Sequence, residues 1–130
     1  MDFLKYISTP HSVYTENSPM KTIWPITKGQ IVHGWIYFPS GPAGLLHVIV
    51  KRAKTQLFPM DTGQSYRLDD CIVLLNGNYW IDQPPYKLTI ETWNESTTYD
   101  HAISIGLSIS DVVAAPKKKS FISKFLNKND

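Results

Sequence analysis

Residues 31–58 read IVHGWIYFPSGPAGLLHVIVKRAKTQLF and hold two runs rich in β-branched and aromatic residues. The runs are Ile31–Phe38 and Leu45–Lys51, and the six residues between them include two prolines and two glycines. This density of proline and glycine excludes a continuous helix and is typical of a loop between strands. The stretch therefore predicts a β-hairpin whose tip is residues 39–44.

Both predicted strands are largely apolar on their two faces, as in a strand covered on both sides or capped by another subunit. In such a hairpin, His33 and His47 fall on the same face of neighbouring strands, within reach of a shared ion. The close His-x-His spacing of a cupin-like site is missing from this stretch. We therefore expect no metal and no cofactor, and keep a metal enzyme around the two histidines as a third hypothesis.

The chain after residue 54 alternates between short strand patterns and turn residues. Short strands are predicted at Thr55–Met60 and Ser65–Leu68. Asn76-Gly77 favours a tight hairpin turn, because both residue types tolerate positive φ. That turn would join a strand at Cys71–Leu75 to another at Tyr79–Ile81.

The last two predicted strands show the most regular alternation. Tyr86–Trp93 alternates in polarity, and His101–Ile109 repeats a large residue at every second position five times. A helix cannot satisfy a period of two. One face of the last strand is therefore predicted to be core, and the other a small-residue surface.

About eight strands with frequent turns, and no convincing helix in the body, predict an all-β fold. We expect a single antiparallel β-sandwich of jelly-roll type over residues 25–112, with an immunoglobulin-like sandwich as the alternative. The sequence does not distinguish the two topologies.

Residues 1–24 are expected to form an N-terminal arm. Phe3, Leu4 and Ile7 would share one side of one or two helical turns. The arm is predicted to pack along the domain edge or against a neighbouring subunit.

Residues 113–130 are expected to form a basic amphipathic tail, with five lysines and one aspartate for a net charge of +4. Residues 1–112 carry eight basic and ten acidic residues, a net charge of −2. This difference in charge between the two parts of the chain indicates what the chain binds, and it says little about its fold. The tail predicts binding to another protein, or to an anionic lipid or nucleic acid surface, through Lys117, Lys118, Lys119, Phe121, Ile122, Phe125 and Leu126.

The composition, with 42% hydrophobic and 18% charged residues, suits one domain with a core. The single cysteine, Cys71, excludes an intramolecular disulfide, so packing must hold the fold. The first residues have neither the basic nor the apolar region of a signal peptide, and no run is long enough for a membrane span.

Catalytic motifs are missing from the sequence. No serine lies in a Gly-x-Ser-x-Gly elbow, and the carboxylates show no telling spacing, so we expect no enzyme. Aromatic residues near loops, Trp80, Trp93 and Tyr99, could stack on sugar rings, which predicts a carbohydrate- or ligand-binding module as the alternative function. Core or interface packing of the same three residues is the competing interpretation.

Two segments carry a resemblance: WIYFPSGPAGLLHV at residues 35–48 and PYKLTIETWNESTTYDH at residues 85–101. Together they resemble small β-sandwich proteins encoded among the structural genes of phages and other prokaryotic viruses. The resemblance covers roughly residues 30–109 and transfers no functional residue. It implies a virion component, such as a minor capsid, decoration, penton or spike-base protein.

The leading hypothesis is a non-enzymatic structural protein of a viral particle, made in the host cytoplasm and localised to the virion. It would form homo-oligomers and bind other virion proteins through its sandwich faces and terminal segments.

Overall fold

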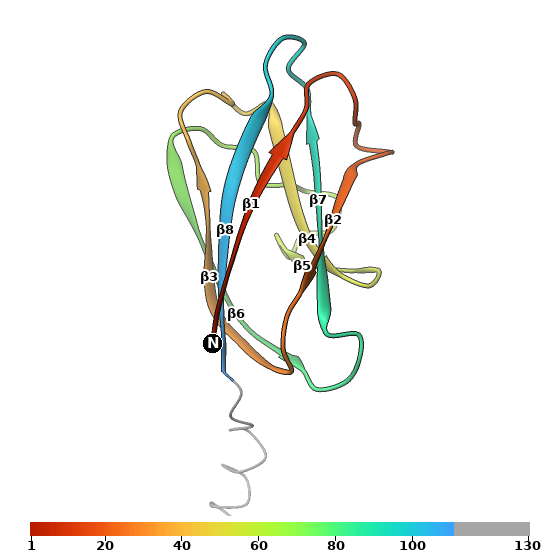
Figure 1. The fold of residues 1–130 in the computed structure, drawn as a ribbon, viewed down its shortest axis with the longest axis vertical. Coiled ribbons are helices and arrows are strands. Elements are labelled where there is room, and N and C mark those ends of the chain that lie inside the picture. Colours follow the sequence, from red (N-terminus) through yellow and green to blue (C-terminus); the bar gives the residue numbers. More distant parts are fainter. Residues whose placement is uncertain (111–130) are drawn as a thin grey trace, which may run out of the picture.

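The computed structural model describes residues 1–110, which form two antiparallel sheets of four strands each, lying face to face (Figure 1). The predicted all-β class and antiparallel sandwich are confirmed, and residues 1–110 contain no helix. The strands are β1 (Asp2–Thr9), β2 (Met20–Pro25), β3 (Gly29–Phe38), β4 (Leu46–Arg52), β5 (Thr55–Phe58), β6 (Cys71–Ile81), β7 (Lys87–Asn94) and β8 (His101–Ser110).

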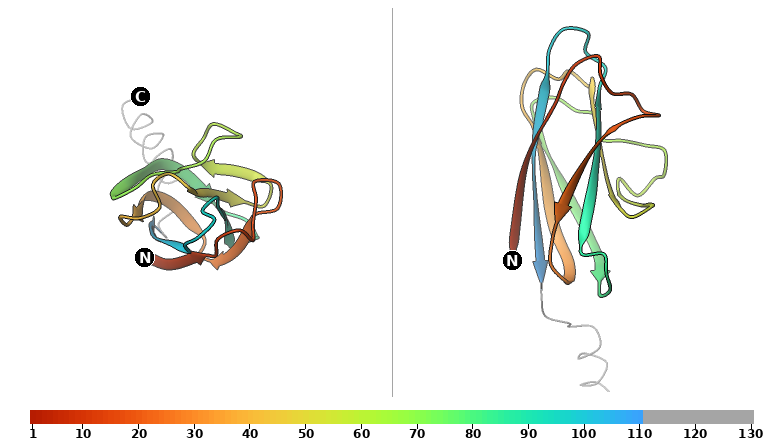
Figure 2. Two further views of the ribbon diagram at one scale, coloured as in Figure 1. Left: turned by 90° about the horizontal axis from the view of Figure 1, so that it is seen from above. Right: turned by 45° about the vertical axis from the view of Figure 1, so that its right-hand side comes forward.

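The strand order is β1-β8-β3-β6 in one sheet and β2-β7-β4-β5 in the other. Four of the pairings are nested: β1 with β8, β2 with β7, β3 with β6, and β4 with β5. Figure 2 shows the two layers from above and from one side. The first and last strands are therefore neighbours, and the Met1 amine donates a hydrogen bond to the Ile109 carbonyl at 2.8 Å.

The hydrophobic core lies between the two sheets, where alternate side chains of the strands meet. The core face predicted on the last strand is confirmed, since four large aliphatic residues of β8 are at most 2% exposed and its small residues point outward. Burying each such side chain contributes roughly 1.5–3 kcal/mol. The buried residues of β8 are Ile103, Ile105, Leu107 and Ile109.

The hairpin predicted between Ile31–Phe38 and Leu45–Lys51 is wrong. β3 and β4 belong to different sheets, and residues 39–45 cross from one layer to the other. The proline- and glycine-rich segment does end both strands. However, consecutive apolar strands can bury their faces across a sandwich core as well as side by side in one sheet. Asp69 holds the crossing, because its carboxylate accepts hydrogen bonds from the backbone N–H groups of Gly41 and Ala43 at 2.9 and 2.8 Å.

The turn predicted at Asn76-Gly77 is also wrong, because β6 runs through it without interruption. The pairing of β3 with β6 shifts register here, so that the step from Asn76 to Tyr79 lies opposite the step from Ile31 to His33. This irregularity is a β-bulge, and glycine is common in bulges as well as in tight turns. The strand predicted at Ser65–Leu68 is reduced to one bridge, in which Tyr66 pairs with Val48.

The helical turns predicted near the N-terminus are wrong, since residues 2–9 form β1 and residues 20–25 form β2. The spacing of the apolar residues fits period two equally well, and pairing along the whole of β8 favours the strand. Each sheet gains one strand from this segment. Residues 1–24 are therefore part of the sandwich rather than an arm beside it.

The residues that the structure describes include no helix with the length and hydropathy of a membrane span. The tail predicted for residues 113–130 lies outside the described residues.

Candidate functional site

The N-terminal residues predicted to bind a partner, Phe3, Leu4 and Ile7, do not share a surface. Ile7 is buried in the core and Phe3 packs against it, because both point inward from β1. Leu4 points outward and is 71% exposed. Of the three residues, Leu4 alone is available to a neighbouring molecule.

The C-terminal residues predicted to bind partners lie outside the described residues. They are Lys117, Lys118, Lys119, Phe121, Ile122, Phe125 and Leu126.

The three aromatic residues predicted to stack on a ligand lie in three separate places. Trp80 is half-buried on β6, where it pairs with Gln30, and Tyr99 is exposed in the β7–β8 connection. Trp93 points outward from β7 but is only 4% exposed, because loops cover it. A shared stacking platform is therefore not formed by these residues.

The predicted placement of His33 and His47 on one face is wrong. His33 is exposed on the outside of the first sheet, whereas His47 points outward from β4 in the second sheet. The whole core lies between the two side chains, because β3 and β4 are not neighbours. Within residues 1–110, no group of three or more His, Cys, Asp or Glu side chains is placed to hold a metal ion.

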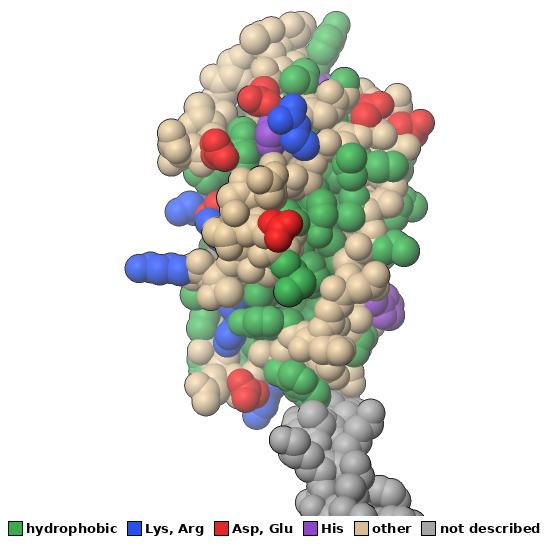
Figure 3. Space-filling model, turned by 180° about the vertical axis from the view of Figure 1, so that it is seen from behind, with side chains coloured by type: hydrophobic (Ala, Val, Ile, Leu, Met, Phe, Trp, Pro, Cys, Tyr) green, Lys and Arg blue, Asp and Glu red, His purple; other side chains and the backbone are tan. Residues whose placement is uncertain are grey.

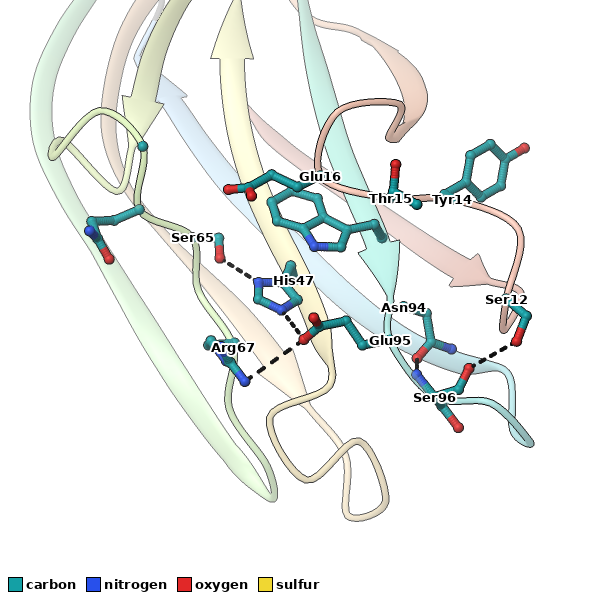
Figure 4. A pocket seen from close by; sticks show the side chains of 13 residues that line it. Ser12, Tyr14, Thr15, Glu16, His47, Ser65, Arg67, Asn94, Glu95 and Ser96 are labelled. Atoms are coloured by element: carbon teal, nitrogen blue, oxygen red, sulfur yellow. Dashed lines mark hydrogen bonds and ion pairs between the residues drawn. The ribbon is translucent and has the colours of Figure 1, made fainter.

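His47 is the centre of a polar network on the outer side of the second sheet (Figure 4). Its Nδ1 lies 2.7 Å from the Ser65 hydroxyl, and its Nε2 lies 2.7 Å from Glu95 Oε2. The ring also stacks on the Trp93 indole, with centroids 4.6 Å apart and planes 10° from parallel. Arg67 Nη2 approaches Glu95 Oε2 at 3.9 Å.

The ionisation of the Glu95 carboxylate determines which nitrogen of His47 donates a hydrogen bond to it. The hydrogen bond from His47 lowers the pKa of Glu95, and the positive charges of His47 and Arg67 lower it further. An ionised Glu95 can only accept a hydrogen bond, so His47 Nε2 is the donor to it. When Nδ1 of the ring carries no proton, it accepts a hydrogen bond from the Ser65 hydroxyl.

This order of hydrogen bonds is that of a Ser–His–acid triad, in which a base accepts the serine proton and an acid orients the base. Acyl transfer also needs N–H donors for the oxyanion, often from the residue after the nucleophile. That residue is Tyr66, whose N–H already donates to the Val48 carbonyl at 2.9 Å. The preceding N–H, of Gln64, donates to the Asp61 carbonyl at 3.0 Å. Neither of these two N–H groups is therefore available to an oxyanion.

The polar cleft is the cavity of about 590 Å³ beside this network. Its floor is the outer side of β4 and β7, and the β1–β2, β5–β6 and β7–β8 connections form its walls. In Figure 4 the segment bearing Tyr14, Thr15 and Glu16 lies across the cleft from Arg67. The lining residues are Ser12, Tyr14, Thr15, Glu16, His47, Gly63, Gln64, Ser65, Arg67, Trp93, Asn94, Glu95 and Ser96.

Hydrogen bonds between these connections fix the walls of the polar cleft. The buried Thr9 and Thr92 hydroxyls lie 2.8 Å apart, which joins β1 to β7. The Asn94 amide donates to the carbonyls of Thr9 and Tyr99 at 3.1 and 2.9 Å. The Ser96 hydroxyl accepts from the backbone of the β7–β8 connection at 3.0 and 3.2 Å. Hydrogen bonds within the chain therefore hold the walls of the cleft.

The ends of the loops are held by two further carboxylates. Hydrogen bonds from the Ala43 and Gly41 backbones lower the pKa of Asp69. Hydrogen bonds from the His11 backbone and ring lower the pKa of Asp100. Both groups are therefore ionised at neutral pH and act as anchors between connections.

The outside of the first sheet carries the second candidate surface, which we call the apolar face. Two rows of outward residues cross its four strands, and the register aligns Leu4, Gly106, Trp35 and Leu74 in one row and Tyr6, Ser104, Tyr37 and Ile72 in the other. Five of the large side chains are between 41% and 71% exposed. No residue in either row carries a charge. In the view from behind, hydrophobic side chains gather on the right half of the surface and basic side chains lie mostly on the left (Figure 3).

The small residues of β8 make the apolar face flat at its centre. A Cβ placed on Gly106 would lie 2.6–2.7 Å from atoms of the Trp35 indole, so the ring rests directly on the glycine. The neighbouring row has Ser104 at the same position on β8. The face therefore presents aromatic and aliphatic surface without a central ridge.

Comparison with known proteins returns no match: no family model, curated protein or solved structure matches this chain.

The sequence patterns did not predict most residues of the polar cleft or the apolar face as functional residues. Ser65, Arg67 and Glu95 are separated from His47 by 18 to 48 positions, and only the sheet topology brings them together. The apolar face did leave a signal, since Trp35, Tyr37, Ile72 and Leu74 alternate along their strands. That signal fits either burial within a core or an exposed interface.

Proposed function

We propose that this chain is a non-enzymatic structural protein of a viral particle, and that it folds as a jelly roll. The nested strand order supports the topology, because two successive Greek keys give two sheets in which the first strand pairs with the last. Jelly rolls occur in viral capsid proteins, and also in lectins and cupins. The resemblance of residues 30–109 to virion proteins favours the first class.

The observation that carries the proposal is the apolar face. Its five exposed side chains present on the order of 500 Å² of apolar surface, at roughly 150–200 Å² for each fully exposed side chain. The largest apolar patch on a soluble monomer is typically about 300–600 Å² and is often functional. One partner of a standard interface contributes about 800 Å². Surrounding polar residues would have to supply the remaining area as a rim.

The partner that we propose for the apolar face is a second copy of this chain. The two rows carry no charge that would select a charged partner. A flat face with a glycine and a serine at its centre can lie against an identical face, since each copy lacks a ridge there. Two sheets packed in this way reproduce the sheet-on-sheet contact already present inside the domain.

Light scattering of the purified full-length protein tests this interface. Wild type is expected to form a dimer or a larger closed oligomer, and Leu74→Glu is expected to weaken association at least about 100-fold, which is about 2.7 kcal/mol. The matched control is Ile23→Glu, because Ile23 is 49% exposed on the other sheet. Both variants should keep the wild-type far-ultraviolet circular dichroism spectrum, since both side chains lie outside the core of the domain.

Two outcomes would contradict the proposed interface: a wild-type monomer at 100 micromolar concentration, or equal loss of association in the two variants. The viral role has a separate test. Mass spectrometry of particles purified from the source culture should detect this chain at a fixed ratio to the major particle protein.

A further inference from the structure

We propose that the polar cleft binds a neutral saccharide through the Glu95 carboxylate and the Arg67 guanidinium. The cleft lies on the opposite sheet from the apolar face, so this binding does not depend on the proposed assembly role. Its volume of about 590 Å³ falls within the roughly 300–1,000 Å³ of sites for small ligands.

The groups that would contact the ligand are held in place in advance. Glu95 is fixed by His47, whose ring is bonded on both nitrogens and stacked on Trp93. Arg67 is fixed by its Nε, which donates to the Gly44 carbonyl at 2.9 Å. A site whose side chains are already ordered loses less conformational entropy on binding, which favours weakly interacting ligands such as sugars.

The same groups keep hydrogen-bonding capacity that the protein does not use. Glu95 Oε2 contacts both His47 and Arg67, whereas its Oε1 has no partner among residues 1–110. The guanidinium of Arg67 retains N–H groups beyond those that it uses, and its side chain is 55% exposed. Glu16 and Gln64 line the cleft with exposed side chains. The cleft thus offers acceptors and donors side by side.

The charges select the chemical class of the ligand. Two carboxylates, on Glu16 and Glu95, oppose an anion, and the one guanidinium in the cleft already interacts with Glu95. At Glu95 the nearby guanidinium opposes a cation, because Arg67 Nη2 already lies 3.9 Å from Oε2. Neighbouring hydroxyls of a neutral sugar can donate to the carboxylate and accept from the guanidinium at once.

The contribution of Trp93 and His47 to the site is indirect. Trp93 is 4% exposed and His47 covers one face of its ring, so neither residue offers a free stacking surface. Their role is to fix the floor on which Glu95 rests. Recognition is therefore expected to depend on hydrogen bonds, and substitution of the polar residues should weaken it more than substitution of Tyr99.

The test is a printed array of neutral, sialylated and sulfated oligosaccharides, probed with the full-length protein. Binding is expected to neutral glycans, with the sialylated and sulfated ones at background. Titration of the best neutral array ligand should then show at least a tenfold weaker affinity for Glu95→Gln and for Arg67→Ala. The matched control is Glu91→Gln, because Glu91 lies on the same sheet, outside the cleft, and pairs with Lys51 at 3.0 Å.

The proposal is overturned if no glycan binds, if charged glycans are preferred, or if Arg67→Ala binds as tightly as wild type. Arg67→Ala leaves the His47 contacts with Ser65 and Glu95 in place, so it stays informative if Glu95→Gln disturbs the fold. The monomeric Leu74→Glu variant should bind glycans with unchanged affinity. Failure of assembly and failure of glycan binding are thus distinguishable.

Discussion

The two outer faces of the sandwich differ in how their outward side chains find partners. On the second sheet, Lys51 pairs with Glu91 and His47 pairs with Glu95, and connections between strands cover the aromatic surface. On the first sheet, the two rows of the apolar face carry no charge, and five of their large side chains remain exposed. Charged side chains on the second sheet are therefore paired within the chain, whereas the apolar face is open to the partner proposed above.

The largest effect on stability should come from His47. His47→Ala removes two hydrogen bonds and the stack on Trp93, and leaves a cavity, so the free energy of unfolding should fall by about 2–4 kcal/mol. His33→Ala, on the outside of the first sheet, should change it by no more than about 0.5 kcal/mol. Urea unfolding followed by tryptophan fluorescence measures both. Equal losses of unfolding free energy in His47→Ala and His33→Ala would contradict the proposed difference between the two faces.

A smaller effect is expected at the centre of the apolar face. Gly106→Val places a side chain where the Trp35 indole lies, so the variant should lose about 1–3 kcal/mol of unfolding free energy. Near-ultraviolet circular dichroism should report the displaced indole. Ser104→Val, at the equivalent place in the next row, should cost less than about 0.5 kcal/mol. An unchanged Gly106→Val spectrum would mean that the ring does not rest on the glycine in solution.

The smallest effect is a pH dependence on the polar side. Because the pKa of Glu95 is lower in the folded chain than its ordinary value of 4.5, its contribution to stability is complete above that value. The contribution is lost as the pH falls through the folded pKa. Thermal unfolding between pH 6 and pH 3 should therefore show a shallower acid decline for Glu95→Gln than for wild type. Parallel curves would show that the exposed carboxylate contributes little, as solvent screening allows.

Local patterns predicted the strands better than their partners. The alternation along His101–Ile109 gave both the strand and its buried face, because period two admits one explanation. Pairing depends on contacts between distant residues, and the same Pro-Gly segment can end a hairpin or cross a sandwich. Asn76-Gly77 shows the same limit, since a bulge and a tight turn favour the same residue types.

The polar cleft was the least predictable part. Trp93 was selected for its residue type near a loop, but its stacking on His47 depends on the pairing of β4 with β7. Ser65 and Arg67 lie in a stretch predicted as a short strand, and that pattern does not indicate that they approach His47 and Glu95. The apolar face left a signal in the sequence, because a predicted strand such as Ile31–Phe38 is apolar on both sides. The alternation of residues does not indicate which of the two sides stays exposed.

The nested pairing has a consequence for synthesis of the chain on the ribosome. β1 is made first, yet its only hydrogen-bonded neighbour in the sheet is β8, which is made last among the described strands. The innermost pair, β4 with β5, can form early, and the others can close around it only as each later strand emerges. Between the synthesis of β1 and that of β8, the backbone of β1 is unpaired and its apolar side is uncovered. Nascent strands in this condition are prone to pair with the wrong partner. The order of translation thus makes β8 the strand that ends this exposure.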